Sequence, residues 1–275
     1  MSKFDIDHSQ QLLQKFLSDK HCLVILTGAG ISVSSGIPTY RDANGDWQHS
    51  TPIQHQDFIN HKRSRQRYWL RSFAGWPAIK RAKPTYAHKV INQLEKKGLV
   101  ELTVTQNVDR LHQKAGSRNV IDLHGRLDRV ICLACKNYCG REWVQNQLKD
   151  TNPFLTESRD LGPDGDADVG NHLVQDLVEP ICSSCSGILK PDVVFFGGQV
   201  DKSLVQQIYQ TLENADGLLI IGTSLRVFSG YRFSRYASSI NLPIASVNPG
   251  LIRGEELIGT NIRAEADLAF QDIKL

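Results

Sequence analysis

The chain has 275 residues, of which 40% are hydrophobic and 22% charged, and its net charge is +3. This length suits one large domain or a large domain with a smaller insertion, and the composition is ordinary for a soluble globular protein. The charge is too small to indicate nucleic-acid or membrane binding. The sequence also contains no run of about 18 apolar residues, which a membrane-spanning helix would need. The first residues lack a targeting pattern, so we expect a cytoplasmic protein whose six cysteines are thiols or metal ligands and not disulfides.

The first predicted elements lead into a Gly-rich loop. The apolar spacing in residues 9–18 favours an amphipathic helix, and the continuous apolar run 22–26 indicates a buried strand. The strand runs into residues 27–42, TGAGISVSSGIPTYRD. A buried strand followed by a Gly-rich turn and a helix start brings backbone N–H groups close to a phosphate, although this spacing is not GxGxxG. Alone, the loop is equally compatible with a nucleotide phosphate and with a tight turn that binds nothing.

Residues 42–83 indicate a helical and loop insertion. The polar, aperiodic segment 42–56 is long for a compact domain, which makes it a candidate lid. Residues 61–76 are helical in pattern and rich in arginine and aromatic side chains. A further helix is predicted from Pro84, at its first turn, to Gly98, which ends it.

Several predicted strands end in polar or glycine clusters. Continuous apolar strands alternate with helices such as 201–214 and 229–240, which predicts the α/β class with a Rossmann-like, doubly wound parallel sheet. A strand over 266–270 is predicted to come last. The strand-end clusters are Gly28-Ala29-Gly30, Gln106-Asn107, Gly222-Thr223-Ser224 and Asn248-Pro249-Gly250. Ligands of open α/β sheets bind beyond the carboxyl ends of the strands, so four such clusters at one edge predict a ligand site.

A small zinc-binding module is predicted over residues 130–189, which hold five of the six cysteines. The pairs Cys132-x2-Cys135 and Cys182-x2-Cys185 each have the spacing that places two thiolates on one tetrahedral Zn²⁺. Four protein ligands leave no open position, so the ion should be structural; free or redox-active thiols remain the alternative. Cys139 is interpreted as a bystander. The Rossmann-like domain then comprises residues 1–129 and 190–275.

His124 is a candidate base. It follows a predicted strand over 120–123 and lies at the same sheet edge as the Gly-rich loop. A histidine with a pKa near neutrality can take a proton from a sugar hydroxyl. An isolated histidine is more often structural than catalytic, and no GxSxG nucleophile motif accompanies this one.

Seven ordered motifs resemble the sirtuins, the NAD-dependent protein lysine deacylases. They are GAGISVSSGIPTYRD, TQNVDRLHQKAG, LHG, the paired CxxC, KPDVVFFGG, GTSLRVFSG and SVNPG, and they cover almost the whole chain. The segment RQRYWLRSFAGWP is similar to the mitochondrial-type class II sirtuins linked to lipoamide and branched acyl groups. Two departures stand out, because many sirtuins carry Pro-Ala where Ser229-Gly230 stand here, and Arg110 occupies a position often held by a small or uncharged residue.

The resemblance implies a reaction on NAD. The acyl oxygen of an acylated lysine would attack C1′ of the nicotinamide ribose, and nicotinamide would leave. His124 would be the general base on the ribose hydroxyl, with Asn107 as the second catalytic residue, and water would finally release lysine and O-acyl-ADP-ribose. The residues implied for NAD binding are Gly28, Ala29, Gly30, Ser32, Tyr40, Arg41, Gln106, Asn107, Val108, Asp109, Gly222, Thr223, Ser224, Asn248, Pro249, Gly250 and Ala264.

The resemblance also implies a substrate site for an acyl-lysine protein or peptide. The segment of Val193, Val194, Phe195, Phe196 and Gly197 would pair with the peptide as an added β strand. Tyr68 and Arg71 share a helix face, and in sirtuins that remove acidic acyl groups a Tyr and an Arg at this spacing hold the carboxylate. We therefore expect a preference for acidic or branched acyl groups, with a solvated Arg71 as an equal alternative. The protein is expected to be a monomer.

Rival functions share parts of this pattern. An NAD-dependent mono-ADP-ribosyltransferase would use the same pocket and the same nicotinamide cleavage, and the sequence does not separate it cleanly from a deacylase. A nucleotide-sensing binding module would not need His124, Asn107 and Asp109 together. A hydride-transferring dehydrogenase is disfavoured because GxGxxG is absent.

Overall fold

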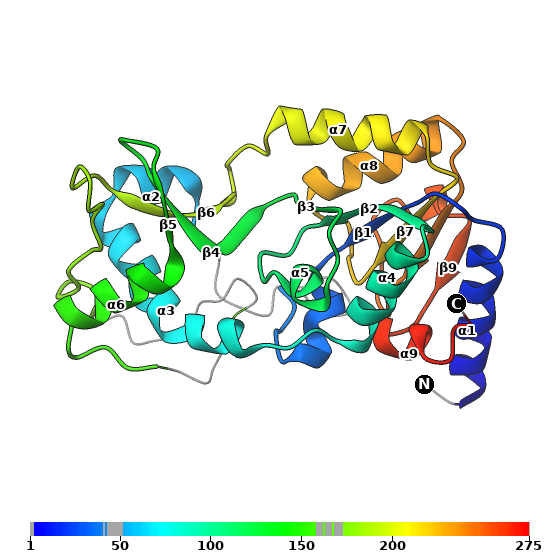
Figure 1. Cartoon of the computed structure of the whole chain (residues 1–275), viewed down its shortest axis with the longest axis horizontal. Coiled ribbons are helices and arrows are strands. Elements are labelled where there is room, and N and C mark those ends of the chain that lie inside the picture. The colour runs from blue at the N-terminus through cyan, green and yellow to red at the C-terminus, as the bar shows by residue number, and fades with distance from the viewer. Residues whose placement is uncertain are drawn as a thin grey trace.

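A six-stranded parallel sheet organises the larger lobe of the computed structural model, which describes residues 3–40, 42, 52–157, 162, 167 and 173–274 (Figure 1). The strand order is β3-β2-β1-β7-β8-β9, and all neighbouring strands run parallel. The strands are β1 (Leu23–Thr27), β2 (Val100–Thr105), β3 (Val120–Asp122), β7 (Gly217–Ile221), β8 (Ile244–Val247) and β9 (Thr260–Ile262). Strands β2 and β3 are added in sequence order on one side of β1, and β7, β8 and β9 are added in sequence order on its other side. The order therefore reverses between β1 and β7, which is where open α/β sheets bind ligands.

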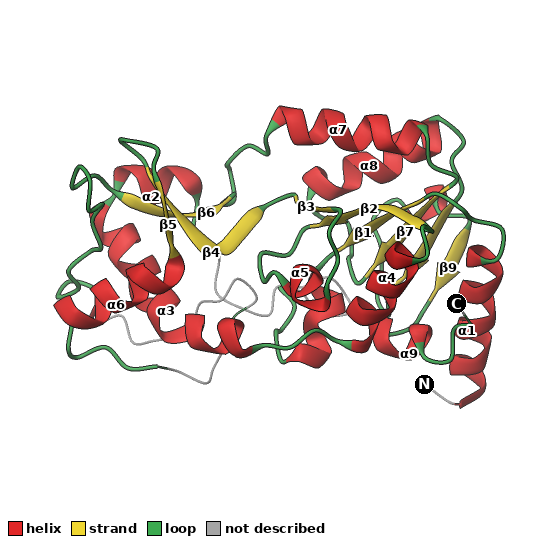
Figure 2. Ribbon diagram, viewed as in Figure 1, coloured by secondary structure: helices red, strands yellow, loops and turns green. Residues whose placement is uncertain are grey.

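Helices cover both faces of this sheet, as the doubly wound prediction requires (Figure 2). One face packs against α1 (Lys3–Leu17), α4 (Tyr86–Lys96) and α9 (Ala266–Phe270), and the other against α7 (Lys202–Glu213) and α8 (Phe228–Ser239). Alternate residues of β1 serve the two cores, with Leu23 and Ile25 on one side and Val24 and Leu26 on the other. All five β1 residues are buried, which is why the strand reads as one apolar run.

The helix predicted from Pro84 begins two residues later. Thr85 is its N-cap, and the hydroxyl of Thr85 accepts from the backbone N–H of His88, while the His88 side chain reaches back to the Thr85 amide. This reciprocal pair is a capping box, so Pro84 precedes the cap and does not occupy the first turn. The helix buries Val90, Ile91 and Leu94 against the sheet, which fits their helical spacing.

The prediction of a last strand over residues 266–270 was wrong. This segment is the helix α9, and the last strand is β9, only three residues long, immediately before it. Ala266, Ala269 and Phe270 are buried while the two residues between them are less so, which is the i, i+3, i+4 pattern of a helix.

The smaller lobe combines the cysteine-rich module with the helical insertion (Figure 1). Its sheet has the order β5-β4-β6 and is antiparallel, with strands β4 (Gly125–Cys132), β5 (Tyr138–Gly140) and β6 (Leu189–Val193). Its helices are α2 (His55–Asn60), α3 (Lys62–Arg81) and α6 (Arg141–Thr151). Since β4 and β6 extend beyond residues 130–189 at both ends, the domain boundaries given above stay a prediction.

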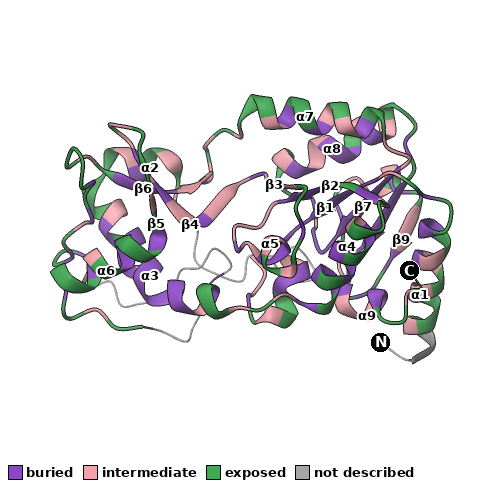
Figure 3. Cartoon of the chain, in the orientation of Figure 1, coloured by how far each residue is buried: buried purple, intermediate pink, exposed green. Residues whose placement is uncertain are grey.

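One apolar core joins the two parts of the smaller lobe (Figure 3). Phe58, Trp69 and Phe73 of α2 and α3 pack in the same cluster as residues of β4, α6 and β6. Arg141 is almost fully buried there, and its guanidinium lies 5.5 Å and 5.4 Å from the ring centroids of Trp69 and Trp76. The insertion therefore folds onto the cysteine-rich module. Most of the candidate lid, residues 43–51, lies outside the described residues.

The remaining short elements are η1 (Ala29–Ser35), α5 (Leu111–Ala115) and η3 (Glu255–Leu257). Within the described ranges, no helix has both the length and the apolar character needed to cross a membrane.

Candidate active site

A cavity of about 850 Å³ opens beyond the carboxyl ends of β1, β2, β7 and β8. Its wall contains all four strand-end clusters and His124, and residues 193–197 of the smaller lobe close the opposite side. The predicted NAD and catalytic residues on the wall are Gly28, Ala29, Gly30, Tyr40, Gln106, Asn107, Val108, Asp109, His124, Gly222, Thr223, Ser224, Asn248, Pro249 and Gly250. Ser32, Ala264 and Arg71 do not line it, and Arg41 lies outside the described residues.

The loops after β1 and β7 meet at the floor of the cavity. The amide of Gly28 donates to Ile221 O at 3.0 Å, and the amide of Gly30 donates to Gly222 O at 2.8 Å. A Cβ on Gly30 would lie 2.7 Å from Gly222 Cα, so only glycine allows this approach. After this contact the chain enters the 3₁₀-helix η1, where the sequence predicted a helix start.

The cavity wall fits a dinucleotide in volume and carries cationic side chains, beside the carboxylates of Asp42, Asp109, Glu265 and Asp267. A volume of about 850 Å³ is within the usual range for ligand sites. Lys202, Arg226 and Arg232 line the wall, and the buried Nε–H of Arg232 has no acceptor among the described residues. Cationic side chains around a concave site attract an anion such as a pyrophosphate.

Ser32 acts beneath the cavity wall and not on it. It is fully buried, and its hydroxyl donates to Asp109 Oδ2 at 2.7 Å while it accepts from Asn107 Nδ2 at 3.1 Å. Asp109 Oδ1 accepts from the Leu111 amide at 2.9 Å, and Asn107 Nδ2 also lies 3.1 Å from Gly28 O. Burial raises the pKa of Asp109, and the bonds from Leu111 and Ser32 oppose that rise. Ser32 thus holds two predicted site residues in place.

His124 has a partner at each ring nitrogen. Nδ1 lies 2.9 Å from the backbone oxygen of Gln106, and because a carbonyl only accepts, Nδ1 must carry the proton. Nε2 is then the unprotonated nitrogen, and it accepts from the Ser229 hydroxyl at 2.7 Å. Burial lowers the pKa of His124, while the bond to Gln106 raises it. The histidine is therefore a neutral base at neutral pH, with its basic nitrogen fixed.

The chain turns sharply after His124. Gly125 has a φ of +83°, and a Cβ there would lie 2.1 Å from Asp192 O, so the turn requires glycine. His124 thus stands between β3 of the large sheet and β4 of the small one. The amide of Val194 donates to His124 O at 2.8 Å, which ties the predicted peptide-binding segment to the same residue.

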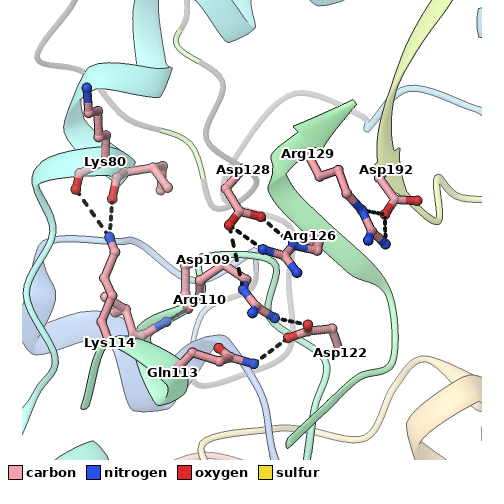
Figure 4. A network of polar contacts seen from close by, with 12 residues as sticks. Lys80, Asp109, Arg110, Gln113, Lys114, Asp122, Arg126, Asp128, Arg129 and Asp192 are labelled. Carbon is pink, nitrogen blue, oxygen red and sulfur yellow. Dashed lines mark hydrogen bonds and ion pairs between the residues drawn. The ribbon is translucent and has the colours of Figure 1, made fainter. Parts of the chain in front are cut away.

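Arg110 belongs to a charged network beside this turn (Figure 4). Its guanidinium pairs with Asp122 of β3 and lies 3.8 Å from Asp128 of β4. Asp128 also accepts from Arg126 at 2.6 Å. Arg110 has a φ of +66° at the N-terminus of α5, a conformation that is uncommon for a side-chain-bearing residue. Its role, for which the sequence offered no account, is to join the larger lobe to β4.

The four predicted zinc ligands form one cluster. The Sγ atoms of Cys132, Cys135, Cys182 and Cys185 all lie within 4.8 Å of one another, and two of the separations are 3.5 Å and 3.7 Å. Tetrahedral Zn²⁺ with Zn–S bonds of about 2.3 Å requires separations of about 3.8 Å, so the donor set fits the ion. Cys139 is outside the cluster, as the spacing predicted.

The two CxxC turns have the same backbone form. Lys136 and Ser186, each directly after the second cysteine of its pair, have φ values of +62° and +56°. Their amides donate to Cys132 O at 3.1 Å and to Cys182 O at 2.9 Å. This repeated turn points both thiols of each pair toward one centre.

The predicted substrate residues are partly brought together. Tyr68 and residues 193–197 line the cavity, and the rings of Tyr68 and Phe195 are 5.3 Å apart. Phe196 O accepts from the His55 amide and Phe195 O from the Gly198 amide, both at 2.8 Å, so with the Val194 amide at least three backbone groups of the segment are already paired. Arg71 instead donates from Nε to Ala167 O at 3.2 Å.

The sequence missed Ser229 as a site residue. It lines the cavity and contacts the base, yet it is 105 positions away from His124 along the chain. The sequence feature that could have indicated Ser229 is its difference from the family pattern, since in GTSLRVFSG it stands where many sirtuins carry a proline.

Comparison with known proteins finds relatives along almost the whole chain. The model of the family described as "Sir2 family" matches residues 28–229. A Bordetella bronchiseptica protein named "NAD-dependent protein deacetylase" is 44% identical over 264 residues, which cover 96% of each chain. The human "NAD-dependent protein lipoamidase sirtuin-4, mitochondrial" is 44% identical over 249 residues, covering 89% of this chain and 79% of the human one.

Solved structures show the same fold. A Sir2 structure with a deacetylated p53 peptide and 3′-O-acetyl ADP-ribose superposes with a TM-score of 0.76 at 26% identity, covering 94% of both chains. A Sir2 complex with a p53 peptide and NAD⁺ gives a TM-score of 0.73 at 26% identity, covering 93% of this chain and 92% of the other.

Proposed function

Because the chain belongs to the Sir2 family and is an NAD-dependent protein deacylase, we propose which of its residues perform each step and which acyl groups it removes. The observation that supports the assignment best is the neutral His124, which lines the cavity and whose unprotonated Nε2 accepts from Ser229 on the same wall. A fixed, neutral imidazole in a cavity is equipped to take a proton from a hydroxyl.

NAD, when bound, supplies an ADP-ribosyl group whose C1′ carbon accepts the acyl oxygen as nicotinamide departs. Arg232 would hold its pyrophosphate beside the glycine loops, because its Nε–H lies at the cavity wall without an acceptor among the described residues. Asn107 and Asp109, both fixed by Ser32, would hold the nicotinamide end. His124 would then remove the proton of a ribose hydroxyl, and water would complete the release of lysine and O-acyl-ADP-ribose.

The acyl-lysine peptide would bind along residues 193–197. Such a strand addition uses unpaired backbone groups at a sheet edge. Here β6 ends at Val193, and the following residues run along the cavity with Phe195 packed on Tyr68. This route would deliver the acyl group next to His124, because Val194 is hydrogen-bonded to that residue.

The preferred acyl group is proposed to be acidic or branched. Tyr68 on the cavity wall supports a pocket for a chain longer than acetyl. An acidic acyl group would also need a contact with the guanidinium of Arg71, which lies about one turn after Tyr68 in α3. In the structure the Nε–H of Arg71 donates to Ala167 O. The solvated-arginine alternative predicts that Arg71 has no influence on acyl choice.

The test compares acetyl, glutaryl and methylglutaryl peptides with NAD on the wild type, on Arg71→Met and on Tyr68→Phe. Nicotinamide release and the identity of the acyl product are measured together. A selective loss of the acidic substrates in Arg71→Met supports the acidic preference, and equal rates in both proteins remove Arg71 from the pocket. Formation of ADP-ribosylated protein without O-acyl-ADP-ribose would instead favour the ADP-ribosyltransferase.

A cytoplasmic location and a monomeric state complete the proposal. Cysteines that are free or able to bind a metal support a reducing compartment such as the cytoplasm. Cell fractionation tests this location. Size-exclusion chromatography with light scattering tests the monomer, and an elution at twice the mass of 30.8 kDa would contradict it.

A further inference from the structure

The hydroxyl of Ser229 occupies the only basic site of His124. Nδ1 carries the proton that is donated to Gln106 O, so the ring has one lone pair, at Nε2. Ser229 Oγ lies 2.7 Å from that nitrogen and is its donor. A ribose hydroxyl that is to lose its proton to His124 therefore meets a lone pair that is already engaged.

We propose that Ser229 is a proton relay between the ribose hydroxyl and His124, an assignment that rests on the proposed deacylase function. Ser229 Oγ gives its own proton to Nε2 and accepts the proton of the ribose hydroxyl in the same step. The ribose oxygen keeps its electron pair for attack on the acyl carbon. The products of the transfer are a neutral serine and a protonated His124, so protons and charge balance. A hydroxyl suits this task because it donates and accepts at one atom.

The surroundings hold Ser229 in the relay position. It lies in the first turn of α8, and its neighbour Gly230 packs on the Gln106 side chain, since a Cβ there would lie 2.6 Å from Gln106 Oε1. The same Gln106 orients His124 through its backbone oxygen and is anchored by Nε2 to Thr223 Oγ1 at 3.0 Å. The serine, the base and the residue that orients the base thus form one packed unit. Ser229 also lines the cavity and is only partly buried.

This relay is particular to chains with a hydroxyl at this position. A proline there, as in many sirtuins, has no side-chain donor, and the ribose hydroxyl would then contact the histidine directly. The relay therefore gives the Ser229-Gly230 departure a chemical meaning that its position in the motif alone did not reveal.

The kinetic test separates the two halves of the reaction. Ser229→Ala should lower the rate of O-acyl-ADP-ribose formation by about 100-fold, the lower range for loss of a general acid–base group. Exchange of labelled nicotinamide into NAD, which needs only the first step, should stay within about 2-fold of wild type. Ser229→Thr keeps the hydroxyl and should restore the product rate to within about 10-fold. Ser239→Ala, at the far end of α8, is the matched control, because its hydroxyl bonds to Tyr236 O.

A spectroscopic test needs no catalysis. In ¹⁵N-histidine-labelled protein without ligands, His124 should show a protonated Nδ1 and a hydrogen-bonded Nε2. The Nε2 resonance should move downfield in Ser229→Ala, toward that of a free imine nitrogen, and should return in Ser229→Thr. His124→Ala identifies the signal.

The outcomes are distinct. An unchanged Nε2 resonance, or wild-type O-acyl-ADP-ribose formation in folded Ser229→Ala, overturns the relay. A faster reaction in Ser229→Ala also overturns it, because it shows that the serine merely blocks the base. A wild-type protein that shows the Nε2 contact but makes no O-acyl-ADP-ribose would instead contradict the proposed function.

Discussion

The amide of Gly30 donates to the carbonyl oxygen of Gly222 at 2.8 Å, which joins the loop after β1 to the loop after β7. These two strands flank the point at which the sheet order reverses. The contact therefore fixes the floor of the NAD cavity, and it explains why both loops carry glycine at the point of contact.

Substitution of Gly30 should disturb this floor. Gly30→Ala would place a Cβ 2.7 Å from Gly222 Cα and 2.8 Å from Gly222 O, so the two loops must separate. The Kd for NAD should rise at least about 10-fold, equivalent to about 1.4 kcal/mol, as measured by calorimetry. Gly140→Ala is the control, because its Cβ meets no atom within 4 Å. Unchanged affinity in Gly30→Ala would show that the loops tolerate separation.

Loss of one zinc ligand should destabilise the smaller lobe. Cys182→Ser should reduce bound zinc from one ion per chain to a small fraction, and the loss of about 3 kcal/mol or more should lower Tm by about 10 °C. Cys139→Ser should keep the ion, because that thiol is outside the cluster. Metal analysis with thermal unfolding measures both. Full zinc content in Cys182→Ser would contradict the four-cysteine site.

The acid limb of the activity profile should lie below pH 6.5. Burial lowers the pKa of His124, and a general base works only in its neutral form. Activity should therefore persist as the pH falls to 6.5 and decline only below it, as the folded-state pKa is reached. The measurement is kcat/KM against pH at saturating NAD. An inflection above pH 6.5 would contradict the lowered pKa of His124, because it would mean that the imidazole is more exposed or lies closer to a carboxylate than the structure shows.

Two buried histidines should make the fold sensitive to acid. His88 and His112 pack with ring centroids 4.6 Å apart, and burial lowers the pKa of His88 to about 3 and that of His112 well below its usual value. Both are neutral in the folded state and take up protons on unfolding below pH 6.5. Their contribution to stability is thus complete above pH 6.5 and is lost as the pH falls toward the folded-state values.

Urea unfolding at pH 7 and pH 5 measures this effect. His88 alone should account for about 2 kcal/mol of stability lost between those values, at about 1.4 kcal/mol per pH unit below 6.5. His88→Gln should be less stable at pH 7 but should lose less on acidification. His61→Gln, at an exposed position, should leave the loss unchanged. An identical acid loss in wild type and His88→Gln would exclude His88 as its source.

The charged network at Arg110 should stabilise the joint between the lobes. Arg110→Asn removes the charge while tolerating the positive φ, and it leaves Asp122, with a side chain 15% exposed, without its cation. We expect a loss of about 1–3 kcal/mol by urea unfolding. Lys80→Gln, which breaks a pair exposed to 56% and 52%, should cost less than about 1 kcal/mol. Equal costs in the two variants would refute a special role for Arg110.

Local patterns predicted the elements whose burial is uniform. The apolar run 22–26 predicted a buried strand, and β1 is buried along its whole length because it is covered on both faces. The cysteine pairs were recognised because a tetrahedral ion demands that spacing. The four strand-end clusters were predicted to meet at one ligand site because parallel strands end at a common edge, and all four line the cavity.

Contacts between distant segments could not be predicted in this way. Ser32 was expected to face the cofactor, but its contact with Asp109 depends on how two loops pack. The pairing of Ser229 with His124 depends on where α8 begins relative to β3, which no local pattern contains. The strand error at 266–270 arose because five residues are too few to distinguish the periods of a strand and a helix.

Cys132 of the four-cysteine cluster and the base lie at opposite ends of a single strand. β4 ends at Cys132, and His124 directly precedes its first residue, so about 25 Å of chain separates them, along a strand whose pairing with β6 is irregular between Gly125 and Val130. A compound that extracts zinc would therefore act as an allosteric inhibitor, because the freed end of β4 would release the turn that aims the imidazole. Such inhibition would be noncompetitive with NAD, and added zinc would reverse it.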